Sequence, residues 1–354
     1  MTLLTATLAR IAPQDAGWRA QAQARLDQLI MPHWALGRLM DLALDLAGIT
    51  ASLQPPVSRK TIVVMAGDHG VAAEGVSKYP QEVTAQMVHG FVSGMAGISA
   101  LSRLAGADVV TVDMGVVADL TPLAEAGRIV SKRIAPGTAN IAVGPAMTRQ
   151  QAQQAIEAGL EVVEELAEYV DVFGTGDMGI ANTTPSTAVA AALTGTPVAA
   201  LTGRGTGIDD GQLARKIAVV ERALAVNQPD SRDGLDVLAK VGGFEIGGIA
   251  GVILGAAARR KPVVVDGFIS TAGALVAQAL CPTGSQYIIA AHRSVEPGHR
   301  VMHTKLGREP LLDLNLRLGE GTGAALAMNL IEAAQRILTQ VATFAEAHVS
   351  TAER

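Results

Sequence analysis

Six short runs rich in β-branched residues recur along the chain, and each follows a segment with helical spacing of its apolar residues. The runs are TIVVMAGDHG from Thr61, ADVVTVDMG from Ala107, VDVFGTGDMG from Val170, PVAALTGRGTG from Pro197, KPVVVDGFIS from Lys261 and SQYIIAAHRS from Ser285. Nearly continuous apolar strands separated by helices are typical of a parallel sheet covered on both faces. We therefore predict an α/β fold with a doubly wound, mainly parallel six-stranded sheet of the Rossmann-like kind.

Each run ends in a small or polar segment that carries a chemically useful side chain. These side chains are Asp68 and His69, Asp113, Asp177, Arg204, Asp266, and His292 with Ser294. In open α/β sheets, ligands bind outside the carboxyl ends of the strands. The sequence therefore predicts a binding site at this edge of the sheet.

The two ends of the chain differ from its middle because they carry helical rather than strand patterns. We expect residues 1–55 and 305–354 to pack together as a small helical domain. Residues 56–304 should form the α/β domain that carries the predicted binding site. A final helix is expected from about residue 322 to 345, which would bring Glu320 back toward the sheet.

The charge balance and the apolar segments exclude several classes of partner. The net charge is −5, and no basic block stands out, so nucleic acid is not an expected partner. Cys281 is the single cysteine, which excludes an intramolecular disulfide and fits a reducing compartment. The N-terminus lacks a signal-peptide pattern, and the apolar stretch 246–258 is too short to span a bilayer. We expect a cytoplasmic protein without membrane contact.

The segment GTGDMG, residues 174–179, matches the dinucleotide fingerprint G-x-G-x-x-G. It is predicted to follow a strand and to precede a helix, and Arg204 stands near the position where a 2′-phosphate partner belongs. An NADP-dependent oxidoreductase is therefore the alternative function. Against it, Asp177 would face the pyrophosphate at close range, where like charges repel strongly.

The segment GRGTG, residues 203–207, opens a predicted helix that carries Lys216. Glycines leave backbone N–H groups open to an anion, and Arg204 and Lys216 add positive charge, so we predict a phosphate site. A tight turn with a solvated arginine is the structural alternative. The acidic pair Asp209-Asp210 follows this loop, whereas transferases fed by phosphoribosyl pyrophosphate carry an acidic pair before theirs.

Two further segments are candidates for ligand contact. The segment HRSVEPGHRVMH supplies His292, Glu296, His299 and His303, whose spacing allows a zinc site as an alternative. Pro297 and Gly298 interrupt this run, so we expect no metal and a histidine that positions substrate or caps a loop. The long loop from 67 to 87 is typical of a binding loop, and its polar residues are candidates for hydrogen bonds to a flat heterocycle, with solvation of either glutamine as the alternative. These residues are Ser77, Tyr79, Gln81 and Gln86.

The segment LGEGTG places Glu320 in a glycine loop that opens the last predicted helix. Such loops usually hold anions, because unpaired N–H groups and the helix dipole point outward there. A carboxylate in the middle of such a loop therefore suggests a chemical role for Glu320. This argues against a nucleotide-binding regulator without chemistry.

Taken together, these segments resemble the nicotinate-nucleotide–dimethylbenzimidazole phosphoribosyltransferase family. The matching blocks are AGDHGVAAEGVSKYPQEVTAQM, GTGDMGIANTTPSTA, TGRGTG, GGFEIGGIAG with VVVDGFIS, AAHRSVEPGH and LDLNLRLGEGTGAALA, in the family's order over residues 65–330. The resemblance implies transfer of phosphoribose from nicotinate mononucleotide to 5,6-dimethylbenzimidazole or a related base. The product would be α-ribazole 5′-phosphate for the lower ligand of cobalamin. It also implies a homodimer that needs no cofactor.

The resemblance assigns roles to individual residues. Glu320 would be the general base that takes a proton from the incoming ring. The nucleotide and its phosphate would contact Gly179, Arg204, Gly205, Gly207, Lys216 and Ser294. The base would contact Ser77, Gln86, Asp177, Met178 and Leu318. The family commonly reads G-E-M-G-I-G-N-T-T, and this chain has Asp177 in place of that Glu and Ala181 in place of the Gly before Asn.

Two effects compete for the pKa of Glu320. A helix dipole favours ionisation by about 0.3–1 kcal/mol. Burial against an apolar ring raises a carboxyl pKa by up to about 3–5 units. We expect burial to dominate when the substrate closes over Glu320, which is then a stronger base than a solvated glutamate.

Overall fold

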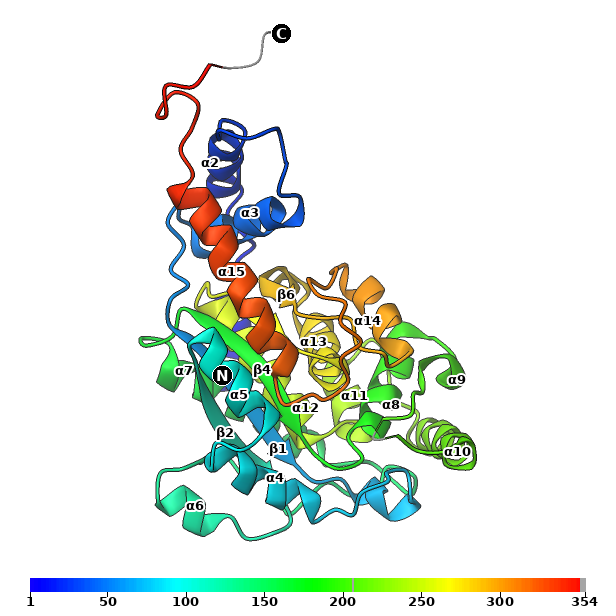
Figure 1. Cartoon of the computed structure of the whole chain (residues 1–354). Helices are drawn as coiled ribbons and strands as arrows, with labels where there is room; N and C mark the ends of the chain where they lie inside the picture. The colour runs from blue at the N-terminus through cyan, green and yellow to red at the C-terminus, as the bar shows by residue number, and fades with distance from the viewer. Residues whose placement is uncertain (206, 351–354) are drawn as a thin grey trace.

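A single parallel sheet forms the centre of the molecule. The computed structural model describes residues 1–205 and 207–350, and within them six parallel strands pair in the order β3-β2-β1-β4-β5-β6 (Figure 1). The strands are β1 Lys60–Gly67, β2 Ala107–Gly115, β3 Val130–Ser131, β4 Val172–Met178, β5 Val263–Val265 and β6 Ile288–Ala290. The order reverses between β1 and β4, which is the switch point at which such sheets bind ligands. The predicted fold class is confirmed.

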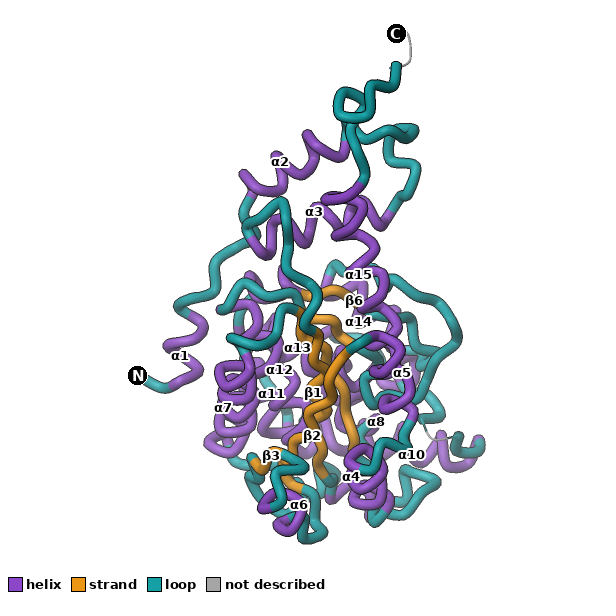
Figure 2. The backbone as a smooth tube through the Cα atoms, turned by 60° about the vertical axis from the view of Figure 1, so that its left-hand side comes forward, coloured by secondary structure: helices purple, strands orange, loops and turns teal. Residues whose placement is uncertain are grey.

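Helices cover both faces of the sheet (Figure 2). They are α1 Leu3–Leu8, α2 Ala16–Leu26, α3 Arg38–Thr50, α4 Val83–Val92, α5 Gly97–Ala105, α6 Thr121–Glu125, α7 Arg149–Leu166, α8 Thr183–Thr194, α9 Val198–Leu201, α10 Asp210–Asn227, α11 Gly234–Val241, α12 Phe244–Ala258, α13 Phe268–Leu280, α14 Gly298–Leu306 and α15 Thr322–Gln340, with 3-10 turns at Gly70–Glu74 and Pro282–Tyr287. Successive strand side chains point to opposite faces. Val63 and Met65 therefore join the core with α7, α12 and α13, whereas Ile62 and Val64 join the core with α3 and α15.

The most apolar segment of the sequence is the buried helix α12. Glycines let α12 and α7 approach closely, since a Cβ on Gly251 would lie 2.0 Å from the Ile156 carbonyl oxygen. A Cβ on Gly159 would likewise lie 2.1 Å from the Gly248 carbonyl oxygen. In the described part of the chain, no helix is both long and apolar enough to cross a membrane.

The chain ends meet beside one end of the sheet. α3 packs against α2 and α15, Leu29 and Thr343 form an isolated antiparallel bridge, and Arg25 donates from Nε to the Leu338 carbonyl at 2.8 Å. Figure 1 shows α2, α3 and the far half of α15 projecting away from the sheet. α1 packs instead on α7 and α12. The division into 1–55 with 305–354, and 56–304, stays a prediction.

The strand predicted from Pro197 is wrong. Residues Val198–Leu201 form the one-turn helix α9, which packs on α8 and α14 and has no sheet neighbour among the described residues. Pro197 has φ −56° and its carbonyl accepts from the Ala200 N–H, so the proline begins a turn. The remaining strand of the sheet is β3, a two-residue edge strand paired with β2.

Candidate active site

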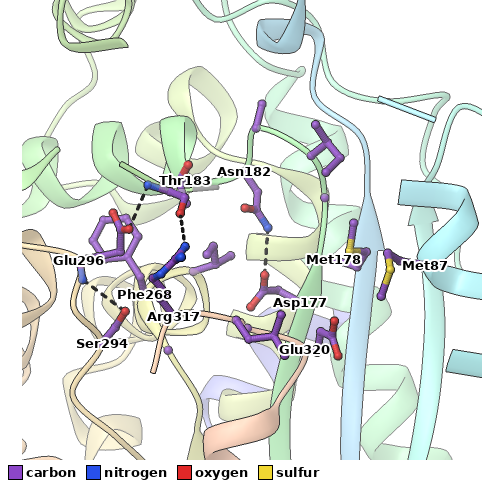
Figure 3. Close-up of a pocket in the computed structure, with 18 of the residues that line it drawn as sticks. Met87, Asp177, Met178, Asn182, Thr183, Phe268, Ser294, Glu296, Arg317 and Glu320 are labelled. Carbon is purple, nitrogen blue, oxygen red and sulfur yellow. Dashed lines mark hydrogen bonds between the residues drawn. The ribbon is translucent and has the colours of Figure 1, made fainter. Parts of the chain in front are cut away.

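A cavity of about 510 Å³ opens at the carboxyl edge of the sheet (Figure 3). Its lining residues are Tyr79, Val83, Met87, Asp177, Met178, Gly179, Ile180, Ala181, Asn182, Thr183, Gly205, Gly267, Phe268, Ile269, His292, Ser294, Glu296, Arg317, Leu318, Gly319 and Glu320. Segments that follow β1, β4, β5 and β6 all contribute lining residues, as we predicted from the polar side chains at the strand ends. Of the predicted site residues, the lining includes Asp177, Met178, Gly179, Gly205, Ser294, Leu318 and Glu320.

The G-x-G part of the dinucleotide-like motif is not a loop. Residues Val172–Met178 form β4, so Gly174 and Gly176 lie inside a central strand and cannot cradle a pyrophosphate. Gly176 instead makes room for the loop before α15, since a Cβ there would lie 2.5 Å from the Glu320 carbonyl oxygen. The expected placement of this motif after a strand is therefore wrong, and the geometry removes the basis of the oxidoreductase alternative.

Glu320 sits in a constrained loop with its carboxylate turned into the cavity. Gly319, Glu320 and Gly321 have φ of 84°, 64° and 90°, so a non-glycine residue occupies the left-handed region between two glycines. Glu320 is 5% exposed, and its Oε2 accepts a hydrogen bond from the Ile98 N–H at 3.1 Å, in the first turn of α5. Burial raises the pKa of Glu320, although the Ile98 hydrogen bond opposes the shift. This is the direction expected of the substrate-covered site.

The anion that the α15 loop binds is another protein side chain. Asp266, directly after β5, accepts from the Gly321 N–H at 3.1 Å and from the Ala324 N–H at 3.0 Å. These are backbone donors at the start of α15, where a carboxylate is stabilised by the helix dipole. Because Asp266 takes this position, the Glu320 carboxylate is directed to α5 and to the cavity.

Asp177 provides a second buried carboxyl group in the cavity wall. Its Oδ2 accepts from Asn182 Nδ2 at 3.0 Å, and its Oδ1 has no hydrogen-bond partner among the described residues. Burial, with the nearby charge of Asp266, raises the pKa of Asp177 well above its ordinary value. A Cβ on Gly319 would lie 3.2 Å from both carboxyl oxygens, so only glycine lets the Glu320 loop pack this closely. The two acids therefore share one end of the cavity.

The same end of the cavity has an apolar surface suited to a flat ring. Met87 and Met178 lie side by side near Glu320 in Figure 3, and Tyr79 and Leu318 add further apolar lining. Thioethers make favourable contacts with aromatic rings. Ser77 and Gln86 are outside the lining, and their neighbours Tyr79 and Met87 contribute instead.

The other end of the cavity is polar and includes Gly205 of the glycine segment. Gly205 donates its N–H to Glu296 Oε1 at 3.0 Å, and the Glu296 N–H donates to Ser294 Oγ at 3.4 Å. Lys216 lies behind this wall, where its Nζ donates to Thr183 Oγ1 at 2.7 Å. Burial lowers the pKa of Lys216 to about 8, and the charge of Glu296 opposes that shift. A backbone donor and a buried ammonium thus meet, as expected of a phosphate site.

Two residues predicted for the phosphate loop do not line the cavity. The Arg204 guanidinium donates to the Ile208 carbonyl at 2.9 Å and pairs with Asp210, so it is turned away from the cavity. Gly207 is not among the lining residues either. Thr206, between them, lies outside the described residues.

The histidine segment does not assemble into a metal site. His299 Nδ1 accepts from the Ser294 N–H, and its Nε2 contacts Thr271 Oγ1, both at 2.8 Å. Both nitrogens are therefore engaged. Among the described residues, no group of three or more His, Cys, Asp or Glu side chains is arranged to hold a metal ion. His292 lines the cavity, and its Nε2 lies 3.7 Å from Asp266 Oδ1.

Comparison with known proteins identifies the family. A phosphoribosyltransferase family model matches residues 11–349. The nicotinate-nucleotide–dimethylbenzimidazole phosphoribosyltransferase of Syntrophotalea carbinolica is 63% identical over 350 residues, which cover 99% of each chain. The chain belongs to this family. A relative with the same name from Desulfotalea psychrophila is 58% identical over 100% of both chains.

A solved structure from the family has the same fold. The enzyme of that name from Thermus thermophilus superposes with a TM-score of 0.89 at 46% identity, covering 96% of this chain and 100% of that chain. The family resemblance seen in the sequence is confirmed.

Sequence reasoning missed several residues that line the cavity. Asn182 and Thr183 begin α8 in the segment after β4, and Phe268 begins α13 after β5, so their positions after strand ends were an available signal. Glu296 was considered only as a metal ligand. Arg317 stands three residues before Glu320, but no local pattern marked it.

Proposed function

We propose that this chain transfers phosphoribose from nicotinate mononucleotide to 5,6-dimethylbenzimidazole or a related base. The products are nicotinate and α-ribazole 5′-phosphate, the precursor of the cobalamin lower ligand. One observation carries the proposal: the buried carboxyl groups of Asp177 and Glu320 line the apolar end of a cavity whose other end has the Gly205 N–H. A flat base and a phosphate thus have separate, chemically suitable ends.

The reaction releases a proton from the base, and a group in the site has to accept it. As one nitrogen of the benzimidazole bonds to C1′ with inversion, the bond from C1′ to the nicotinate nitrogen breaks, and its electron pair stays on that ring. Nicotinate leaves from a cationic pyridinium, so its departure needs little acid assistance. The N–H on the other side of the benzimidazole becomes acidic, and Glu320 accepts that proton. Burial supports this role because it raises the pKa of Glu320.

Nucleotide affinity should fall as the pH rises through about 8, the value to which burial lowers the pKa of Lys216. The ammonium form attracts phosphate and the neutral amine does not. Phosphate is already a dianion there, because its second pKa is about 6. Affinity should fall by up to about tenfold per pH unit above that value. Calorimetric titration with nicotinate mononucleotide on both sides of this pKa measures the effect.

Lys216→Met provides the control for this pH dependence. The variant should bind the nucleotide weakly and should lose the decline above pH 8. A wild-type profile that stays flat through this range would contradict the assignment of Lys216 to the phosphate.

We also propose that the chain acts as a homodimer. Tyr79 and Leu318 line the cavity yet remain 52% and 60% exposed, which fits burial against a second copy. Light scattering should give twice the mass of one chain. A monomer at the concentrations used for assays would rule out this assembly.

The reaction itself is tested by nicotinate release across a panel of benzimidazoles, purines and phenols. We expect release that depends on the added base and is fastest with a benzimidazole. Absence of release with every base would refute the proposal. A change of NADPH fluorescence on mixing with the protein would instead support an oxidoreductase.

A further inference from the structure

Among the described residues, Arg317 is the one lysine or arginine that lines the cavity. The proposed substrate carries a phosphate dianion and a carboxylate, offset by one pyridinium charge. The lining already contains the carboxyl groups of Asp177, Glu296 and Glu320. Like charges repel strongly in a partly buried site, so an anionic substrate needs a cation there.

The Arg317 guanidinium reaches the polar end of the cavity. Its Nη1 donates to the Gly205 carbonyl at 3.3 Å, while the Gly205 N–H is bonded to Glu296. A Cβ on Gly205 would lie 3.3 Å from Lys216 Nζ, so the buried ammonium is adjacent. Figure 3 shows Arg317, Glu296 and Ser294 grouped together, with the Glu320 carboxylate farther away. A backbone donor, a guanidinium and an ammonium therefore converge at Gly205.

The Glu296 carboxylate already occupies the place where these three donors meet. Glu296 is 7% exposed, and its Oε2 has no hydrogen-bond partner among the described atoms. A Cβ on Gly203 would lie 1.9 Å from that oxygen, so the carboxylate is packed directly against the loop. A buried oxygen without a partner is costly. The site thus binds an oxyanion. The Glu296 carboxylate that now occupies it lacks a hydrogen-bond donor for Oε2.

We propose that Arg317 binds the phosphate of the mononucleotide and that this phosphate displaces the Glu296 carboxylate from the Gly205 N–H. The inference rests on the proposed function. In the exchange, the Arg317 guanidinium donates to the charged phosphate in place of the neutral Gly205 carbonyl. Charge-assisted hydrogen bonds of this kind are about twice as strong as those between neutral groups. Glu296 and the phosphate cannot share one N–H, because both are anions that only accept hydrogen bonds there.

Three ligands separate the phosphate from the other groups of the substrate. They are nicotinate mononucleotide, nicotinamide mononucleotide, which lacks the carboxylate, and nicotinate riboside, which lacks the phosphate. Arg317→Gln should weaken binding of both mononucleotides by about 10- to 100-fold. Binding of the riboside should change by less than about twofold, since rim charges far from a ligand contribute little.

Glu296→Gln should have the opposite effect. The amide keeps an acceptor for the Gly205 N–H but removes the charge that competes with phosphate, so mononucleotide affinity should rise by about 3- to 10-fold near neutral pH. A purely structural role of Glu296 would weaken binding instead. Arg300→Gln is the matched control, since Arg300 is exposed on α14 outside the cavity lining and its substitution should leave affinity unchanged.

The outcomes distinguish this inference from the proposed function. An equal loss of riboside and mononucleotide binding in Arg317→Gln would overturn it, as would unchanged or weaker mononucleotide binding in Glu296→Gln. A loss confined to ligands with the carboxylate would assign Arg317 to nicotinate instead. A wild-type protein that neither binds the mononucleotide nor releases nicotinate would refute the proposed function itself.

Discussion

Glu320→Gln is expected to slow base-dependent nicotinate release by about 10²- to 10⁴-fold, the usual contribution of a positioned general base. Nucleotide affinity should change little, because Glu320 lies at the end of the cavity away from Gly205. The amide oxygen can still accept from the Ile98 N–H, so the loop should keep its conformation. Steady-state rates with dimethylbenzimidazole, combined with calorimetric binding of the nucleotide, measure the two effects separately.

The pH profile provides a further readout of this variant. Wild-type activity should fall on the acid side as Glu320 becomes protonated, at a pH above the ordinary glutamate pKa because burial raises it. Glu320→Gln should lack this acid limb. Glu221→Gln, on the exposed surface of α10, is the matched control and should leave both rate and profile unchanged. Near-normal turnover by Glu320→Gln would overturn the assignment.

Asp266→Ala is expected to lower the free energy of unfolding by about 2–4 kcal/mol, because it leaves two buried N–H groups of the α15 start without an acceptor. Those groups belong to Gly321 and Ala324, and Asp266 itself is fully buried. The catalytic rate should fall as well, since Gly321 adjoins Glu320. Denaturant unfolding and the rate of nicotinate release measure the two losses.

Asp266→Asn separates the hydrogen bonds from the charge. Asparagine keeps one acceptor oxygen for two donors, so its cost should be about half that of the alanine variant. An alanine variant whose stability stays within about 0.5 kcal/mol of the wild type, the range of ordinary surface substitutions, would show that Asp266 does not hold the loop.

Much of the sheet could be predicted because its strands are buried on both faces. The runs from Thr61, Ala107, Val170, Lys261 and Ser285 correspond to β1, β2, β4, β5 and β6. The run from Pro197 has a similar composition, yet four residues are too few for periodicity to distinguish a strand from a helical turn. The edge strand Val130–Ser131 was missed because two residues carry no pattern.

Glycine spacing alone misled the interpretation of GTGDMG. The same letters suit a phosphate loop or a strand that another segment approaches closely. The deciding quantity is the 2.5 Å from a Cβ on Gly176 to the Glu320 carbonyl oxygen. That distance depends on the loop around Glu320, which lies far from Gly176 in the sequence. No local sequence pattern could therefore predict it.

The contacts that shape the site join distant parts of the sequence. Asp266 and Gly321 are 55 residues apart, and Gly205 and Glu296 are 91 apart. The family resemblance assigned roles to Glu320 and Lys216, which the two glycine loops had already marked. It gave no indication that Asp266 would hold the α15 loop, or that Glu296 would occupy the Gly205 N–H.

A crystal structure of the protein bound to dimethylbenzimidazole tests the central claim most directly. The claim is that Glu320 accepts the ring proton inside this cavity. The account predicts a Glu320 carboxylate oxygen within about 2.6–3.2 Å of a ring nitrogen, with the ring held between Met178 and Leu318. A bound ring whose nitrogens are out of reach of Glu320 would contradict it.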